Sequence, residues 1–145
     1  MSVISEKEII KKILTSSKVI AVVGISSDSK RPSNYVAKYL LLKGYKIIPV
    51  NPNMGNWEGL ICYPALQSIP NTLQVDAVVV FRKAQFCLEI AEAAVEINAK
   101  AIWLQEGIIS KETELFAKEN GLLIVMNRCM KKEHEKWKSG SDSQK

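Results

Sequence analysis

The sequence contains very little histidine and cysteine, the residue types that dominate structural metal sites. His134 is the single histidine, and it stands in a charged segment near the carboxyl end. Cys62, Cys87 and Cys129 lie far apart, are odd in number, and show none of the short spacings of zinc ligands. We therefore expect no structural metal site, and this cysteine usage indicates a reducing cytoplasm.

Long apolar runs and targeting signals are also missing. Residues 1–15 alternate charges with isoleucines, which is not the pattern of a signal peptide, and no apolar run is long enough to cross a bilayer. The net charge of +5 is spread along the chain without a nucleic-acid-binding motif. We expect a cytoplasmic protein that binds an anionic small molecule, with neither nucleic acid nor membrane as a partner.

The chain does contain enough apolar sequence for one packed domain. Its 145 residues match the commonest size of a single domain, and 47% of them are hydrophobic. Residues 1–138 are expected to form this domain. Residues 139–145 are rich in Ser and Gly and are expected to be a disordered tail.

Short apolar runs alternate with helical patterns along the sequence. The runs are unbroken and rich in β-branched residues, as in parallel strands buried on both faces, and they predict strands at residues 18–23, 46–50, 76–81, 100–104 and 122–126. A capping box formed by Ser5 and Glu8 opens a first helix. Further helices are expected at residues 35–43, 84–98, 110–120 and 131–138, and residues 51–71 are expected to be a long loop with one short helical turn.

This alternation predicts a three-layer, Rossmann-like, doubly wound α/β fold. Its five-stranded parallel sheet is expected to have the order 3-2-1-4-5, with the chain reversing direction through residues 51–71. Pro49 argues against a central, fully paired position for the second strand. Ligands of such sheets bind beyond the carboxyl ends of the strands, at the switch point beside the first strand.

The loop after the first strand has the composition of an anion site. Gly24 allows a sharp turn and a close approach to a ligand. Pro32 suits the first helical position, Ser33 is an alternative cap, and the amino end of the helix would add N–H groups and a positive dipole. Hydroxyl donors and cations are supplied by Ser26, Ser27, Ser29, Lys30 and Arg31. We predict phosphate binding here, with a purely structural polar loop as the alternative.

The motifs of the commonest nucleotide sites are not complete in this loop. It has one glycine where a dinucleotide loop has Gly-x-Gly-x-x-Gly, and Val50-Asn51-Pro52 offers no carboxylate for ribose hydroxyls. The chain also lacks the glycine–lysine pattern of a P-loop. NAD and ATP are therefore less favoured than another phosphate-bearing cofactor.

A series of ordered motifs runs through residues 18–129. They are Val23-Gly24-Ile25-Ser26, Arg31-Pro32-Ser33, Pro49-Val50-Asn51-Pro52, Tyr63-Pro64, Val80-Phe81-Arg82, Ile102-Trp103-Leu104-Gln105 with Gly107-Ile108, and Val125-Met126-Asn127-Arg128-Cys129. Together they resemble the small, stand-alone CoA-binding domain proteins. These proteins are similar in turn to the CoA-binding domain in the α subunit of succinyl-CoA synthetase.

The resemblance implies that coenzyme A, or an acyl-CoA, lies across the carboxyl edge of the sheet. Its phosphates would contact residues 24–33, and its adenine would lie near residues 50–52 and 81–82. The family would have Asp at position 127, where this chain has Asn127. The implied contact residues are Gly24, Ile25, Ser26, Ser27, Lys30, Arg31, Pro32, Ser33, Val50, Asn51, Pro52, Phe81, Arg82, Gln105 and Gly107.

No nucleophile–base pair accompanies the anion loop. Glu106 has no visible histidine, serine or metal partner, and Arg82 could contact either a phosphate or Glu106 itself. We therefore expect a CoA-binding module without catalysis of its own: a carrier, a sensor, or a partner of a CoA-dependent enzyme, with a homodimer left open. Cys129 could form a mixed disulfide with the CoA thiol, although most cysteines are buried and inert.

Two other classes of function stay open. One is an NAD(P)-dependent oxidoreductase or an acyl-CoA-using transferase. The other is an interaction subunit whose nucleotide pocket is vestigial. Trp103, within the fourth predicted strand, is expected to be a core residue, whereas Phe81 suits either the core or an adenine.

Overall fold

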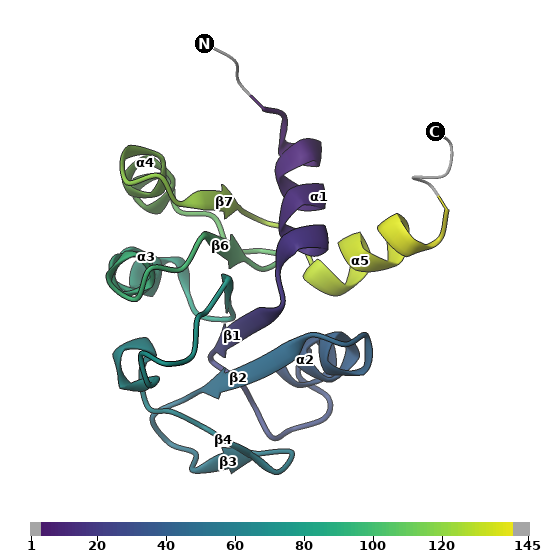
Figure 1. The fold of residues 1–145 in the computed structure, drawn as a ribbon, viewed down its shortest axis with the longest axis vertical. Helices are drawn as coiled ribbons and strands as arrows, with labels where there is room; N and C mark the ends of the chain where they lie inside the picture. The colour runs from purple at the N-terminus through teal and green to yellow at the C-terminus, as the bar shows by residue number, and fades with distance from the viewer. Residues whose placement is uncertain (1–3, 141–145) are drawn as a thin grey trace.

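A five-stranded parallel sheet crosses the middle of the computed structural model, which describes residues 4–140 (Figure 1). The side chains of successive strand residues point alternately into two hydrophobic cores, one on each face. Burial on both faces explains why the strand sequences are unbroken apolar runs. The strands are β1 (Val19–Val23), β2 (Lys46–Val50), β5 (Ala77–Val80), β6 (Ala101–Leu104) and β7 (Leu123–Val125).

Helices cover both faces of this sheet (Figure 1). One face packs against α1 (Glu6–Ser16), α2 (Pro32–Leu42) and α5 (Met130–Lys138). The other face packs against α3 (Cys87–Glu96), α4 (Lys111–Glu119) and the short 3-10 helices η1 (Leu66–Ser68) and η2 (Ala84–Phe86). The predicted three-layer, Rossmann-like α/β fold with five parallel strands is confirmed.

The outer position beside β2 is filled by a different segment from the one expected. The order of the sheet is β2-β1-β5-β6-β7, so residues 77–80 pair with β1 instead of lying outside β2. Beyond β2 lies an isolated parallel bridge between Val50 and Tyr63, which completes the Rossmann pattern as a rudimentary third strand. The prediction that residues 76–81 take that outer position was wrong, because the chain already supplies the position from within residues 51–71.

Residues 51–71 also contain more structure than a loop with one helical turn. The turn is present as η1, but β3 (Asn56–Trp57) and β4 (Leu60–Ile61) form an antiparallel hairpin before it. Glu58 and Gly59 make its tight turn with positive φ angles of 51° and 80°. The hairpin carries Trp57 into the core, where the side chain is 2% exposed.

The helices at the two ends of the chain pack side by side on one face of the sheet. The capping box of Ser5 and Glu8 is confirmed at the start of α1. The predicted helix at residues 131–138 is confirmed as α5, but His134 is buried, with 2% exposure, and is not part of a solvated charged surface. Gly140 ends the described chain in a turn, and residues 141–145 of the predicted tail lie outside the described residues.

None of the helices within residues 4–140 combines the length and the apolar character needed to cross a membrane. Within the same residues, no group of three or more His, Cys, Asp or Glu side chains is placed to hold a metal ion.

Candidate functional site

An open cleft of about 900 Å³ lies beyond the carboxyl ends of β1, β5 and β6. Its walls are the loops that follow these strands, together with the first turns of α2 and α5. β1 lies between β2 and β5, so the chain leaves it toward one side of the sheet and later returns on the other. The cleft is therefore at the switch point where Rossmann-type sheets hold their ligands.

Most of the residues singled out from the sequence line this cleft. Those in its walls are Gly24, Ile25, Ser26, Ser27, Arg31, Pro32, Ser33, Asn51, Phe81, Arg82, Gln105 and Gly107. Lys30, Val50 and Pro52 are outside the lining. Val50 is 3% exposed in the core beneath the cleft, whereas the side chains of Lys30 and Pro52 are in solvent.

Gly24 brings the first loop against the neighbouring strand end. Its φ angle is +88°, and its N–H donates to the carbonyl oxygen of Val50 over 3.0 Å. A Cβ atom at this position would lie 2.7 Å from the carbonyl oxygen of Phe81. Only glycine fits here, because any other side chain would displace the loop that forms the cleft wall.

The carbonyl groups of the same loop are fixed by three side-chain donors. Asn51 Nδ2 donates to the carbonyl of Ile25 over 2.8 Å. Asn34 Nδ2 and Trp57 Nε1 both donate to the carbonyl of Ser26, over 2.7 and 3.0 Å. The missed hairpin thus helps to shape the site, because it supplies the Trp57 donor.

Fixing these carbonyls also orients the N–H groups that follow them. In a trans peptide the N–H points opposite to the C=O, and the described chain has no cis peptide. The N–H groups of Ser26 and Ser27 therefore point away from the donors that hold the loop, and neither has an acceptor within residues 4–140. Both residues line the cleft, so two backbone donors are available to an anion.

The amino end of α2 adds to this positive potential. Arg31 is its N-cap and makes no side-chain cap, Pro32 occupies the first helical position as predicted, and Ser33 is buried in the first turn instead of capping it. The loop before it is held by Asp28, whose Oδ1 accepts from the N–H of Lys30 over 3.0 Å. The positive end of the helix dipole thus opens toward the cleft wall.

Cations outnumber carboxylates around the cleft. The cations are Arg31, Arg82, Lys83, Lys131 and Lys132, and the carboxylates are Glu106 and Glu135. Glu106 is paired with Lys132, whose Nζ lies 3.1 Å from Oε1, so the alternative pairing of Glu106 with Arg82 does not form. The Arg82 guanidinium lies 4.1 Å from the ring centroid of Phe86. The surplus of positive charge suits a ligand with several anionic groups.

Gln105 presents a buried polar group without a partner. The residue lines the cleft and is 4% exposed, and its buried Nε2 atom has no hydrogen-bond acceptor in the described structure. An unpaired buried donor costs about 1–3 kcal/mol, so such groups are normally satisfied by a ligand or by water. Gln105 therefore offers one donor at the cleft wall.

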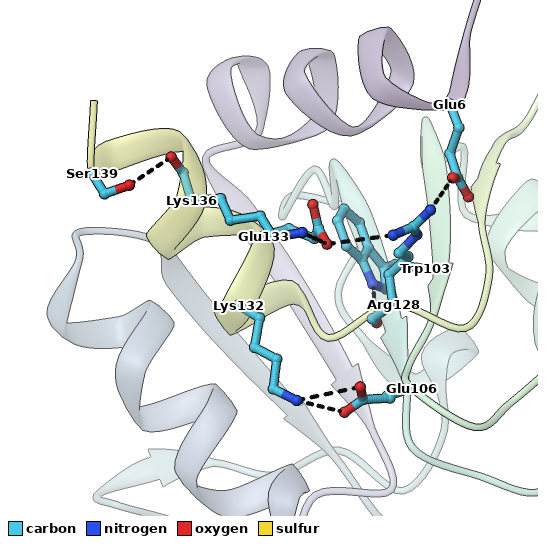
Figure 2. A network of polar contacts seen from close by, with 8 residues as sticks. All are labelled: Glu6, Trp103, Glu106, Arg128, Lys132, Glu133, Lys136 and Ser139. Atoms are coloured by element: carbon cyan, nitrogen blue, oxygen red, sulfur yellow. Dashed lines mark hydrogen bonds and ion pairs between the residues drawn. The ribbon is translucent and has the colours of Figure 1, made fainter. Parts of the chain in front are cut away.

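A network of polar contacts holds the loop that leads into α5 (Figure 2). The Arg128 guanidinium contacts Glu6 of α1 at 2.6 Å and Glu133 of α5 at 3.9 Å, and its carbonyl oxygen accepts from Trp103 Nε1 over 2.8 Å. Trp103 is fully buried, as expected of a core residue. These contacts fix the approach of the chain to Cys129, which lines the cleft.

Asn127 ties this loop to the one after β6. Its Oδ1 accepts from the N–H of Gly107 over 2.7 Å, and its φ angle is +60°. The amide oxygen of Asn127 thus accepts a hydrogen bond that the carboxylate of an Asp at this position could accept as well. Its role here is to position the two loops.

His134 lies between α2 and α5, away from the cleft lining. Its Nδ1 is 2.7 Å from the hydroxyl of Tyr39, and its ring makes edge contacts with Tyr39, Tyr45 and Trp137. Burial lowers the pKa of His134, and the charge of Lys138 lowers it further. As a neutral side chain, His134 of α5 packs against α2 and shares a hydrogen bond with Tyr39.

The contribution of α5 to the site was not expected from the sequence. Cleft-lining residues outside the contact set that the resemblance implies are Tyr35, Met54, Lys83, Ala84, Glu106, Ile108, Cys129, Lys131, Lys132 and Glu135. Of these, the sequence singles out Glu106 only as a candidate base and Cys129 only as a candidate disulfide partner. A signal was present, since Met130, His134 and Trp137 recur at helical spacing and turn inward. That stripe would have placed the charged side of α5 over the sheet edge.

Comparisons with known proteins bear on this cleft. The sequence profile of the family described as "CoA binding domain" matches residues 18–135. The chain is 38% identical over 125 residues to the uncharacterized protein YneT of Bacillus subtilis, covering 86% of this chain and 91% of that protein. A solved structure of a hypothetical protein from Pyrococcus horikoshii is similar, with 40% identity, a TM-score of 0.85 and coverage of 92% of each chain. A dinucleotide-forming acetyl-coenzyme A synthetase from Ca. Korarchaeum cryptofilum shares the fold, with 23% identity and a TM-score of 0.69 over 81% of this chain and 27% of its own.

Proposed function

The chain belongs to the CoA binding domain family, and on this premise we propose that it binds coenzyme A, or an acyl-CoA, in the cleft beyond β1, β5 and β6. One observation carries the proposal. The N–H groups of Ser26 and Ser27 are left free by the side chains that hold their loop, and they line the cleft beside the amino end of α2. A pyrophosphate bridge is the part of coenzyme A that needs such donors.

The adenine keeps the side of the cleft that the family resemblance implies. In the proposed mode it lies toward Asn51 and Phe81, with Arg82 beside it, because these residues line the cleft whereas Val50 and Pro52 do not. Asn51 already holds the loops in place, since Nδ2 donates to the carbonyl of Ile25 and Oδ1 accepts from the N–H of Asn53 over 2.8 Å, and its second Nδ2 hydrogen is left for a ligand. The pantetheine arm then runs toward the loops after β6 and β7, where the free Nε2 of Gln105 can donate to an amide carbonyl.

We propose that the protein acts without catalysis of its own, as a carrier, a sensor or a partner of a CoA-dependent enzyme. Support comes from two of the groups that could serve as a base. The carboxylate of Glu106 is held by Lys132, and the ring of His134 is buried against Tyr39. The free thiols of Cys62, Cys87 and Cys129 suit a reducing compartment, so we place the protein in the cytoplasm.

Calorimetric titration of the purified protein with CoA, acetyl-CoA, NADP and ATP tests this function. We expect saturable binding of CoA or acetyl-CoA at one site per chain, and no heat from NADP or ATP. Mass spectrometry of small molecules released from the freshly purified protein should find a CoA species. Binding of NADP without CoA would replace the proposal with an oxidoreductase. The absence of binding heat with all four nucleotides would favour an interaction subunit with a vestigial pocket.

A further inference from the structure

The three cysteines of this chain differ sharply in their surroundings. Cys87 is fully buried, its Sγ lies 3.6 Å from the carbonyl oxygen of Lys83, and burial raises its pKa to about 11. Cys62 is 5% exposed, its Sγ lies 3.8 Å from the carbonyl oxygen of Asn51, and burial raises its pKa as well. Both are therefore expected to be inert packing residues.

Cys129 is the cysteine that reaches the cleft. It is half-buried, lines the cleft wall, and stands as the N-cap of the nine-residue helix α5. Its position is set by Arg128, which is held through its guanidinium by Glu6 and through its carbonyl by Trp103 (Figure 2). A thiol in a fixed place on a ligand cleft is open to chemistry with what binds there.

A second group in the same cleft points independently to a ligand. Gln105 lines the cleft with only 4% of its surface exposed, and its Nε2 has no partner in the described structure. A donor of this kind matches the amide carbonyls of a pantetheine arm, which is the part of coenzyme A that ends in the thiol. Cys129 lines the same cleft, so an arm bound at Gln105 would place its sulfur in the cleft that also holds this thiol.

The charges beside Cys129 favour an anionic partner. Lys131 and Lys132 occupy the first turn of α5 and line the cleft. Lys132 stands three residues after Cys129, a spacing that places two residues on the same side of a helix. Its Nζ lies 3.1 Å from Oε1 of Glu106, so the ammonium group connects α5 to the loop after β6.

We infer that Cys129 is a thiol–disulfide exchange site that takes coenzyme A as its partner thiol. This inference rests on the proposed function, since it needs CoA bound with its pantetheine arm at Gln105. It gives the binding module a reversible covalent state that reports whether the CoA pool is oxidised. The partner class is a CoA-containing disulfide, such as CoA disulfide or the mixed disulfide of CoA and glutathione.

The step balances without any further oxidant. Cys129 gives up its proton, and its sulfur attacks the CoA sulfur of the disulfide. The bond from Cys129 to the CoA sulfur forms, the old sulfur–sulfur bond breaks, and the second thiol leaves as a thiolate that takes up the proton. Attack by a small reducing thiol on the adduct reverses the step and returns free Cys129 and CoA.

Intact-mass spectrometry after incubation with CoA disulfide tests the inference. We expect one adduct with the mass of CoA less the two hydrogens lost, which dithiothreitol removes. The adduct should be absent in Cys129→Ser and unchanged in Cys62→Ala, the matched loss of a buried thiol. CoA disulfide should react at least tenfold faster than glutathione disulfide, because only CoA is held by the cleft.

Calorimetry with reduced CoA, in the presence of dithiothreitol, separates this inference from the proposed function. If the wild-type protein and Cys129→Ser both bind CoA but the wild type forms no adduct, the exchange site is wrong and the binding function stands. If neither binds CoA and Cys129 reacts equally fast with both disulfides, the thiol is merely accessible and both proposals fail. An adduct on Cys62 or Cys87 would also overturn the inference.

Discussion

Gly24 faces the carbonyl oxygen of Phe81 so closely that a Cβ atom on the glycine would lie 2.7 Å from it. The contact joins the loop after β1 to the end of β5, the two segments between which the cleft opens. A backbone oxygen cannot move aside as the end of a flexible side chain can. The shape of the cleft therefore depends on the absence of a side chain at this position.

Gly24→Ala should destabilise the protein by about 3 kcal/mol, from left-handed strain of roughly 1–2 kcal/mol and overlap of similar size. The matched control is Gly121→Ala, where φ is +69° but nothing lies within 4 Å of the added Cβ, so only strain of about 1 kcal/mol is expected. Urea unfolding measures both changes. Equal losses in the two variants would show that the Phe81 contact does not matter.

Arg31→Ala should weaken CoA binding by roughly ten- to a hundredfold, since a charge-assisted hydrogen bond is worth about 1.5–3 kcal/mol. Lys30→Ala is the matched control, because its neighbouring side chain carries the same charge but lies outside the cleft lining. We expect less than a twofold effect from it in calorimetric titration. A larger loss from Lys30→Ala than from Arg31→Ala would contradict the proposed position of the phosphates.

Glu106→Gln should tighten CoA binding by roughly two- to fivefold, the range of an exposed ion pair. The change frees Lys132, whose Nζ is 3.1 Å from Glu106 Oε1, to contact an anionic group of the ligand. Lys132→Met should weaken binding, and both effects should shrink at high salt. Lys118→Met removes the same charge from α4 and should leave affinity unchanged. Tighter binding in Lys132→Met would refute this role.

The free energy of unfolding should decrease as the pH falls below 6.5, because His134 is buried in the folded protein. Burial first, then the charges of Lys138 and Lys43, hold its pKa below the ordinary 6.5. Well above pH 6.5 the residue is neutral in both states, and its protonation then takes nothing from the stability. As the pH falls from 6.5 toward the folded-state pKa, the unfolded chain gains a proton that the folded chain resists, so the free energy of unfolding falls.

Unfolding in urea between pH 7.5 and 5.5 measures this dependence. His134→Gln is expected to lower stability at every pH, through the lost contact with Tyr39, but to flatten the slope. The comparison is therefore between slopes and not between absolute values. An unchanged slope in the variant would assign the acid sensitivity to other groups.

The strands could be predicted from sequence because burial on both faces leaves an unbroken apolar run. Their order could not, since such a run does not say which neighbour it pairs with. Pro49 was nevertheless informative: it marked β2 as a poor central strand, and β2 pairs with β1 alone among the long strands. The same argument applied to the whole sheet would have moved residues 77–80 to the other side of β1.

Part of the candidate site could likewise be predicted from the sequence, and part could not. The loop from Gly24 to Ser33 was predictable, because the end of the first parallel strand is the switch point whatever the flanking order. The support from Trp57 was not, because a hairpin of two-residue strands leaves little periodicity to detect. The part of the cleft wall formed by α5 was not predicted, because most residues of this helix are charged and few, such as Met130 and His134, mark its buried side.

The bridge between Val50 and Tyr63 has a consequence for how the protein behaves at high concentration. An open sheet edge can recruit a strand from another molecule and start a fibril. Here the N–H of Tyr63 is bonded to the carbonyl of Pro49 over 3.0 Å and its own carbonyl to the N–H of Asn51 over 2.9 Å, while Pro49 has no N–H to offer. The end of β2 is thus closed to intermolecular pairing, and concentrated samples should resist amyloid-like assembly through this border.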